Sequence, residues 1–222
     1  DLLKFLIKQW ALAPKRTFTR QPKNESINLC AGLASIYALL GGEAIAPPDR
    51  REHDEMEASL NFTGIPAEGA GNPRNLVERW LILNESAGGM ALAKFPGVTS
   101  ALCVGELLGL RSDRSRQWGL GIVRRANSNE IDELEIGVQM LAPEAKAVAV
   151  RLDKQRSFQQ ALLLPELKPL KQPATLITAC GIYQPARMLE VALEANGKPV
   201  RILATRLIER TNSFECFQFS LL

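Results

Sequence analysis

The sequence is poor in the residues that most often carry enzyme chemistry. Its single histidine, His53, lies in an acidic stretch, where a solvated side chain is the better interpretation than a general base. The four cysteines, Cys30, Cys103, Cys180 and Cys216, are far apart and form no CxxC pair, so the common zinc and redox motifs are missing. We therefore expect no catalytic residue, no metal site and no cofactor.

Long apolar runs are also missing. No stretch approaches the roughly 20 apolar residues that a membrane-spanning helix needs, and the first residues lack the regions of a signal peptide. We expect a cytoplasmic protein with buried, reduced thiols. Because the chain does not begin with Met, it is expected to be a fragment of something longer or a processed form. The 46% of hydrophobic and 23% of charged residues are ordinary for a folded domain.

Positive charge is concentrated at the N-terminus. Residues 1–26 contain six Lys and Arg residues against Asp1 and Glu25, which gives +4, so the overall charge of +3 leaves −1 for the rest. A basic segment on a near-neutral body is typical of an anion site or of a nucleic-acid-binding arm. A solvated basic face is an equally good interpretation of the charge alone.

Local patterns divide the N-terminal third of the chain. Apolar residues at helical spacing predict a short amphipathic helix over 2–11, and the proline-bounded segment 15–21 predicts an extended or curled basic arm. Residues 27–40 are apolar and fit either a buried strand or a strand that runs into a short helix at 33–40. The Gly-, Pro- and acid-rich residues 41–75 are interpreted as an inserted loop.

Short β segments separated by turn residues follow from residue 77 onward, which is typical of a small barrel. The segments expected in the first unit are 77–83, 89–93, 107–111, 118–125, 133–141 and 147–152. Those expected in the second unit are 160–164, 174–179, 188–194, 200–209 and 214–221. The polar stretch 153–157 is taken as the boundary. The predicted domains are therefore 1–26 (helix and arm), 27–153 (barrel) and 154–222 (a second, smaller β-domain).

Two motifs carry candidate binding chemistry. Arg16 and Arg20 form an RxxxR pattern whose guanidiniums converge on one ligand only if the arm bends, because four extended residues span about 13 Å. Arginine offers a fork of donors that fits a phosphate or the edge of guanine. The second motif contains Asn84, Ser86 and Gly89 in a turn whose paired glycines permit positive φ and close approach of a ligand. Taken singly, surface arginines and a plain β-turn explain both motifs.

Taken together and in this order, RxxxR and NxSxxG resemble the signature of the PilZ family of cyclic di-GMP receptors, and the resemblance spans about residues 15–152. It implies a mainly β protein with a PilZ-type small antiparallel barrel. The second domain is expected to be PilZ-like without the ligand motif. The implied function is that of a bacterial, non-enzymatic receptor that binds cyclic di-GMP and changes domain orientation to signal to an unidentified downstream protein or additional domain.

The resemblance also implies a set of ligand-binding residues. They are Lys15, Arg16, Arg20, Asn84, Ser86, Gly88, Gly89, Arg124 and Arg125. The sequence departs from the family pattern in the inserted loop between the motifs and in Lys15, which stands where the family often has arginine when it binds an intercalated ligand pair. The stoichiometry therefore stays open.

Two other functions remain as alternatives. A single-stranded nucleic-acid-binding barrel would need exposed aromatic platforms, and aromatic residues make up only 6% of the chain, so we do not expect nucleic acid as a partner. A structural or adaptor PilZ protein would bind no small ligand at all.

Overall fold

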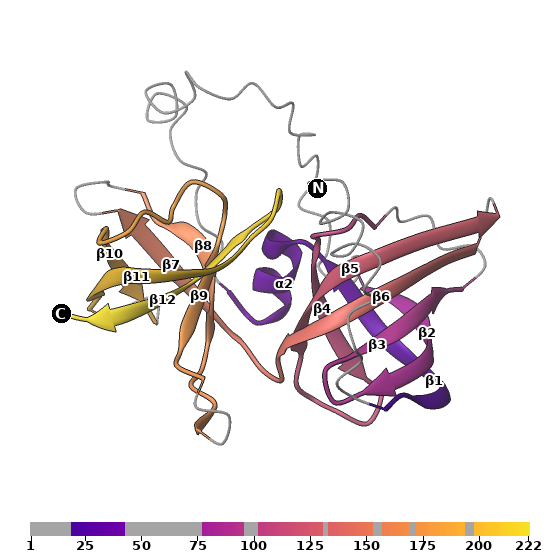
Figure 1. Cartoon of the computed structure of the whole chain (residues 1–222). Helices are drawn as coiled ribbons and strands as arrows, with labels where there is room; N and C mark the ends of the chain where they lie inside the picture. Colours follow the sequence, from indigo (N-terminus) through magenta and orange to yellow (C-terminus); the bar gives the residue numbers. More distant parts are fainter. Residues whose placement is uncertain are drawn as a thin grey trace, which may run out of the picture.

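The structure is a computed structural model that describes residues 19–42, 77–95, 102–130, 133–152, 157–168, 172–193 and 198–222. The predicted helix 2–11, most of the basic arm and nearly all of the predicted loop 41–75 lie outside these residues. The prediction of a mainly β protein with two β-domains is confirmed, because the described strands form two closed barrels of six strands each (Figure 1).

The first barrel is antiparallel and closes in the strand order β1-β2-β3-β6-β5-β4. Its strands are β1 (Gln21–Ala31), β2 (Val77–Ser86), β3 (Gly89–Lys94), β4 (Leu107–Ser112), β5 (Gly119–Glu130) and β6 (Glu133–Ala142). A short helix, α2 (Leu33–Leu39), follows β1 after Gly32, whose φ of 85° turns the chain out of the strand. Of the two structures that the apolar segment 27–40 allowed, the strand that runs into a helix is the correct one.

The second barrel closes in the order β10-β11-β12-β9-β8-β7. Its strands are β7 (Lys146–Leu152), β8 (Gln159–Leu164), β9 (Thr175–Thr178), β10 (Met188–Ala192), β11 (Val200–Arg210) and β12 (Glu215–Leu221). The domain that the sequence analysis expected to be smaller therefore has as many strands as the first.

The boundary between the barrels differs from the predicted one. The segment predicted at 147–152 is a strand, but it pairs with β8 and β10 and so belongs to the second barrel. The first barrel ends at Ala142 and the second begins at Lys146, whereas the boundary was expected at 153–157. The apolar residues of a strand indicate that one of its faces will be buried, but they do not specify with which other strands it will pair.

Three apolar clusters make up the core. Trp80 and Leu92 are fully buried among the side chains that fill the first barrel, and Phe217 is fully buried in the second. A third cluster lies around α2, between the barrels, and contains Ile36, Trp118 and other residues of both barrels (Figure 1). We call it the junction cluster. Because it covers the outer faces of several strands, those strands are buried on both sides, and all four residues of β9 are buried instead of every second one.

The hairpin that joins β11 to β12 also contacts the first barrel. Ser213 donates a hydrogen bond to the backbone carbonyl of Gly105 at 2.9 Å, and Phe214 from the same turn is fully buried in the junction cluster. The second barrel thus packs against the first through both apolar and polar contacts. Within the described part of the chain, no helix is long and apolar enough to cross a membrane.

Candidate ligand-binding site

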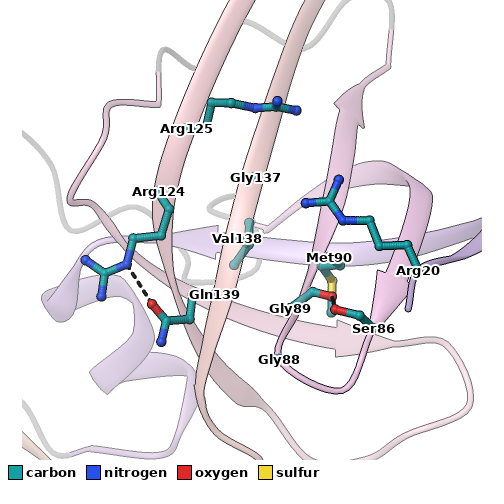
Figure 2. Close-up of a pocket in the computed structure, with 10 residues that line it drawn as sticks. All are labelled: Arg20, Ser86, Gly88, Gly89, Met90, Arg124, Arg125, Gly137, Val138 and Gln139. Carbon is teal, nitrogen blue, oxygen red and sulfur yellow. Dashed lines mark hydrogen bonds between the residues drawn. The ribbon is translucent and has the colours of Figure 1, made fainter. Parts of the chain in front are cut away.

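A pocket of about 400 Å³ opens on the outer face of the first barrel, beside the turn between β2 and β3 (Figure 2). Its lining residues are Arg20, Ser86, Gly88, Gly89, Met90, Arg124, Arg125, Gly137, Val138 and Gln139. Three of them are arginines and none is a carboxylate, so the pocket presents concentrated positive charge to an anionic ligand. Its volume lies in the range of small-molecule sites.

The turn that carries Ser86 and Gly89 forms one wall of the pocket. The Ser86 hydroxyl donates a hydrogen bond to the Gly89 carbonyl at 3.0 Å, which holds the turn closed. A Cβ at Gly89 would lie 2.1 Å from the Val138 carbonyl oxygen, so glycine is required there by the close approach of β6. Neither glycine of the turn is among those with positive φ. The expected need for glycine is therefore met at Gly89 by close packing and not by unusual backbone torsion.

An irregularity in β5 directs two arginines outward next to each other. Val123 pairs with Val138 and Arg125 pairs with Gly137, so Arg124 is the extra residue of a bulge. Figure 2 shows that Arg125 extends across β6 above Gly137 toward Arg20, whose side chain points back at it. Gly137 has no side chain in the way, and a Cβ there would already contact that of Arg125 at 3.4 Å.

Arg124 is held on the other side of the bulge. Its Nε donates to Gln139 Oε1 at 2.8 Å, and its Nη1 and Nη2 donate to the two carboxylate oxygens of Glu209, at 3.2 and 2.7 Å. Glu209 belongs to β11 of the second barrel. The hydrogen bonds from Arg124 hold the pKa of the Glu209 carboxyl below its usual range. Both arginines of the predicted pair therefore line the pocket, but Arg125 extends toward Arg20 whereas Arg124 is bound by the neighbouring barrel.

A second, smaller pocket of about 300 Å³ lies on the other side of the same turn, lined by Thr19, Gln21, Lys23, Glu85, Ser86 and Ala87. Lys23 and Glu85 form a salt bridge there, and the hydrogen bond to Glu85 raises the pKa of the Lys23 ammonium. Asn84 lines neither pocket. Its Oδ1 atom is nonetheless buried without a hydrogen-bond partner, which is unusual for a folded protein.

Six of the nine predicted site residues line the larger pocket, and Asn84 lies two positions before one of them, Ser86. Lys15 and Arg16 are outside the described residues. Sequence reasoning missed Gln139 and Glu209, which hold Arg124, and Gly137, which makes room for Arg125. Nothing local could have revealed Glu209, because 85 positions separate it from Arg124.

Comparison with known proteins agrees with this architecture. Residues 67–147 match the family model of the middle PilZ domain of the cyclic-di-GMP receptor FimW. The first barrel therefore contains a PilZ domain, similar to the middle domain of that cyclic di-GMP receptor. Residues 146–222 match the FimW C-terminal β-barrel domain, so the two matches meet where β7 begins. The first match starts after β1, which closes the first barrel, and therefore does not include Arg20.

One curated relative is the cyclic-di-GMP receptor FimW of Pseudomonas aeruginosa, which is 24% identical over 266 aligned residues. The alignment covers 99% of this chain but only 44% of the relative, so the chain spans less than half the length of that protein. No solved structure matches the chain. The family is one of receptors, that is, of binding proteins.

Proposed function

We propose that this chain binds cyclic di-GMP in the pocket between the β2–β3 turn and β5. The observation that carries the proposal is that Arg20 and Arg125 point toward each other over a pocket with no carboxylate in its lining (Figure 2). The ligand has two phosphates and two guanines, and the guanidinium group fits both chemistries. The relative that shares both barrels is named as a cyclic-di-GMP receptor.

The proposed roles follow from the positions of the side chains. Arg20 and Arg125 bind phosphate or guanine edges from opposite sides, while Gly88 and Gly89 let the ligand approach the backbone of the turn. The unpaired, buried Oδ1 of Asn84 is an acceptor that a guanine N–H or a side chain of the arm would satisfy. On the arm, Arg16 supplies the second guanidinium of the RxxxR motif, with Lys15 beside it.

In the proposed mechanism, the ligand draws the arm onto the first barrel and no bond is made or broken. Because the junction cluster packs the two barrels together, they serve as a platform against which the arm and whatever precedes it change orientation. A downstream protein or additional domain reads that change. The functional units of this proposal are the arm that ends near Arg20, the ligand-binding barrel and the second barrel.

Isothermal titration with cyclic di-GMP tests the proposal, with GMP and cyclic di-AMP as controls for selectivity. Arg16→Ala, Arg20→Ala and Arg125→Ala should each weaken binding by about 1.5 to 3 kcal/mol, the range for hydrogen bonds to charged groups. Arg116→Ala is the matched control, since Arg116 is exposed on the turn before β5 and does not line the pocket. The affinity of the Arg116→Ala variant for cyclic di-GMP should equal that of the parent chain.

Equal affinity in all four variants would contradict the proposed site, and absence of any binding would contradict the proposed function. Titration with a single-stranded oligonucleotide at two salt concentrations separates the receptor from a nucleic-acid-binding barrel. The pocket lining contains no aromatic side chain on which a base could stack, so we expect no such binding.

A further inference from the structure

The arginine that lines the pocket from the bulge of β5 has both of its hydrogen-bonding edges occupied. One edge, formed by Nη1 and Nη2, binds both oxygens of Glu209, and the other begins with Nε, which binds Gln139. Arginine recognises a phosphate best through two parallel hydrogen bonds from one edge. Arg124 therefore cannot offer a phosphate such a pair of bonds without releasing one of its present partners.

Glu209 is placed for this contact by the shape of its own strand. The pairing of β11 with β12 shifts register between Leu207 and Glu209, which turns the carboxylate toward the first barrel. Irregularities in two strands, one from each barrel, thus bring Glu209 and Arg124 together. Their side chains are only 24% and 41% exposed, respectively. The lowered pKa of Glu209 keeps its carboxylate charged at neutral pH.

We infer that Glu209 restrains the ligand pocket, because its carboxylate competes with the anionic groups of the ligand for Arg124. The inference rests on the proposed function. Through this one carboxylate, the second barrel sets how tightly the first barrel binds its ligand. Glu209 also cancels one of the three positive charges that line the pocket, so it lowers the attraction for an anion even before any contact is exchanged.

The opposite role would be that Glu209 orients Arg124 for binding, as a carboxylate often does for a functional side chain. The geometry argues against that role, because the carboxylate occupies the bidentate edge itself and draws Arg124 away from Arg20 (Figure 2). Arg125, which pairs with no carboxylate among the described residues, is the arginine that faces Arg20. The two roles predict opposite effects of removing the charge of Glu209.

The second barrel offers a matched control. Glu190 on β10 accepts a hydrogen bond from Nε of Arg151 on β7 at 2.6 Å and forms a salt bridge with its Nη2 at 2.5 Å. Neither residue lines the pocket. Glu190→Gln therefore removes an arginine–carboxylate pair of similar exposure without touching the ligand site. Any general effect of losing one carboxylate from the second barrel will appear in this variant.

The test measures the affinity for cyclic di-GMP in the parent chain and in the variants Glu209→Gln, Glu190→Gln, Arg124→Gln and Arg124→Gln/Glu209→Gln. Glu209→Gln should bind about twofold to fivefold more tightly, the range expected for a partly exposed ion pair, and Glu190→Gln should bind like the parent. When Arg124 is already replaced by Gln, adding Glu209→Gln should change the affinity for cyclic di-GMP less than it does in the parent chain, or not at all. Weaker or unchanged binding by Glu209→Gln would overturn the inference.

A ligand-free measurement separates this inference from the proposed function. Urea unfolding of the same four Arg124 and Glu209 proteins gives the coupling between the two residues without any ligand. Coupling together with tighter binding by Glu209→Gln supports the inference, and absence of coupling overturns it. If the pair is coupled but the parent chain binds no cyclic di-GMP, the proposed function is wrong. The inference that Glu209 competes with the ligand for Arg124 is then wrong as well. If the ligand binds but Glu209→Gln does not tighten it, only the inference has failed.

Discussion

Two phenylalanines, one in the turn before β12 and one on β12, provide a test of how the barrels are joined. Phe214 and Phe217 are both fully buried and only three positions apart. Phe214 lies in the junction cluster, whereas Phe217 lies in the apolar interior of the second barrel, where its ring contacts that of Tyr183 at 5.3 Å between centroids. The same substitution at the two positions therefore removes the same side chain from two different cores.

Either Phe→Ala substitution should lower the free energy of unfolding by about 3 to 5 kcal/mol, because each leaves a cavity the size of a benzyl group in a close-packed region. The two losses should differ in where they act. Phe214→Ala removes contacts that link α2 and the first barrel to the second, and Phe217→Ala removes contacts within the second barrel alone. Urea unfolding followed by circular dichroism measures the size of each loss.

Native-state hydrogen exchange locates the loss. In Phe214→Ala, amides of both α2 and β8 should exchange faster, since these two elements meet in the junction cluster. In Phe217→Ala, the increase should be greatest in β9 to β12, with α2 less affected. A local loss of 3 kcal/mol corresponds to roughly a hundredfold faster exchange. The same exchange pattern in both variants would refute the division of the core into a junction cluster and two barrel interiors.

Two further predictions concern the pocket and the thiols. Gly89→Ala should weaken binding of cyclic di-GMP in the same titration and should lower the free energy of unfolding by about 1 to 3 kcal/mol, because its Cβ would meet a backbone oxygen. Burial raises the pKa of Cys30 and Cys216 to about 11, above the usual 9.0, so neither thiol should react with a thiol reagent at pH 8 until the chain unfolds. Because the folded state then binds both protons more tightly, the contribution of these thiols to the free energy of unfolding is complete below about pH 9 and should be lost as the pH rises toward 11. A urea unfolding midpoint that stays constant across that range would show that the two thiols are not buried.

The β-rich character and most strand positions could be predicted from the sequence, because they depend on local features. Apolar segments of strand length and turn residues between them indicate strands wherever the chain goes next. The NxSxxG motif also depends on neighbouring residues, so the Ser86–Gly89 turn could be placed before the structure was known.

Other features exist only through contacts between residues far apart in the sequence. The strand β7 belongs to the second barrel because of its partners β8 and β10, and no property of its own residues distinguishes that pairing from one with the first barrel. Likewise, Arg124 and Arg125 are adjacent and chemically identical. A bulge in β5 separates their directions, and Glu209, 85 positions away, then binds one of them. The sequence by itself determined which groups were available to an anionic ligand, since those groups are side chains of single residues. Only the tertiary structure decided which of them face the pocket, because that depends on how strands of two barrels pack against each other.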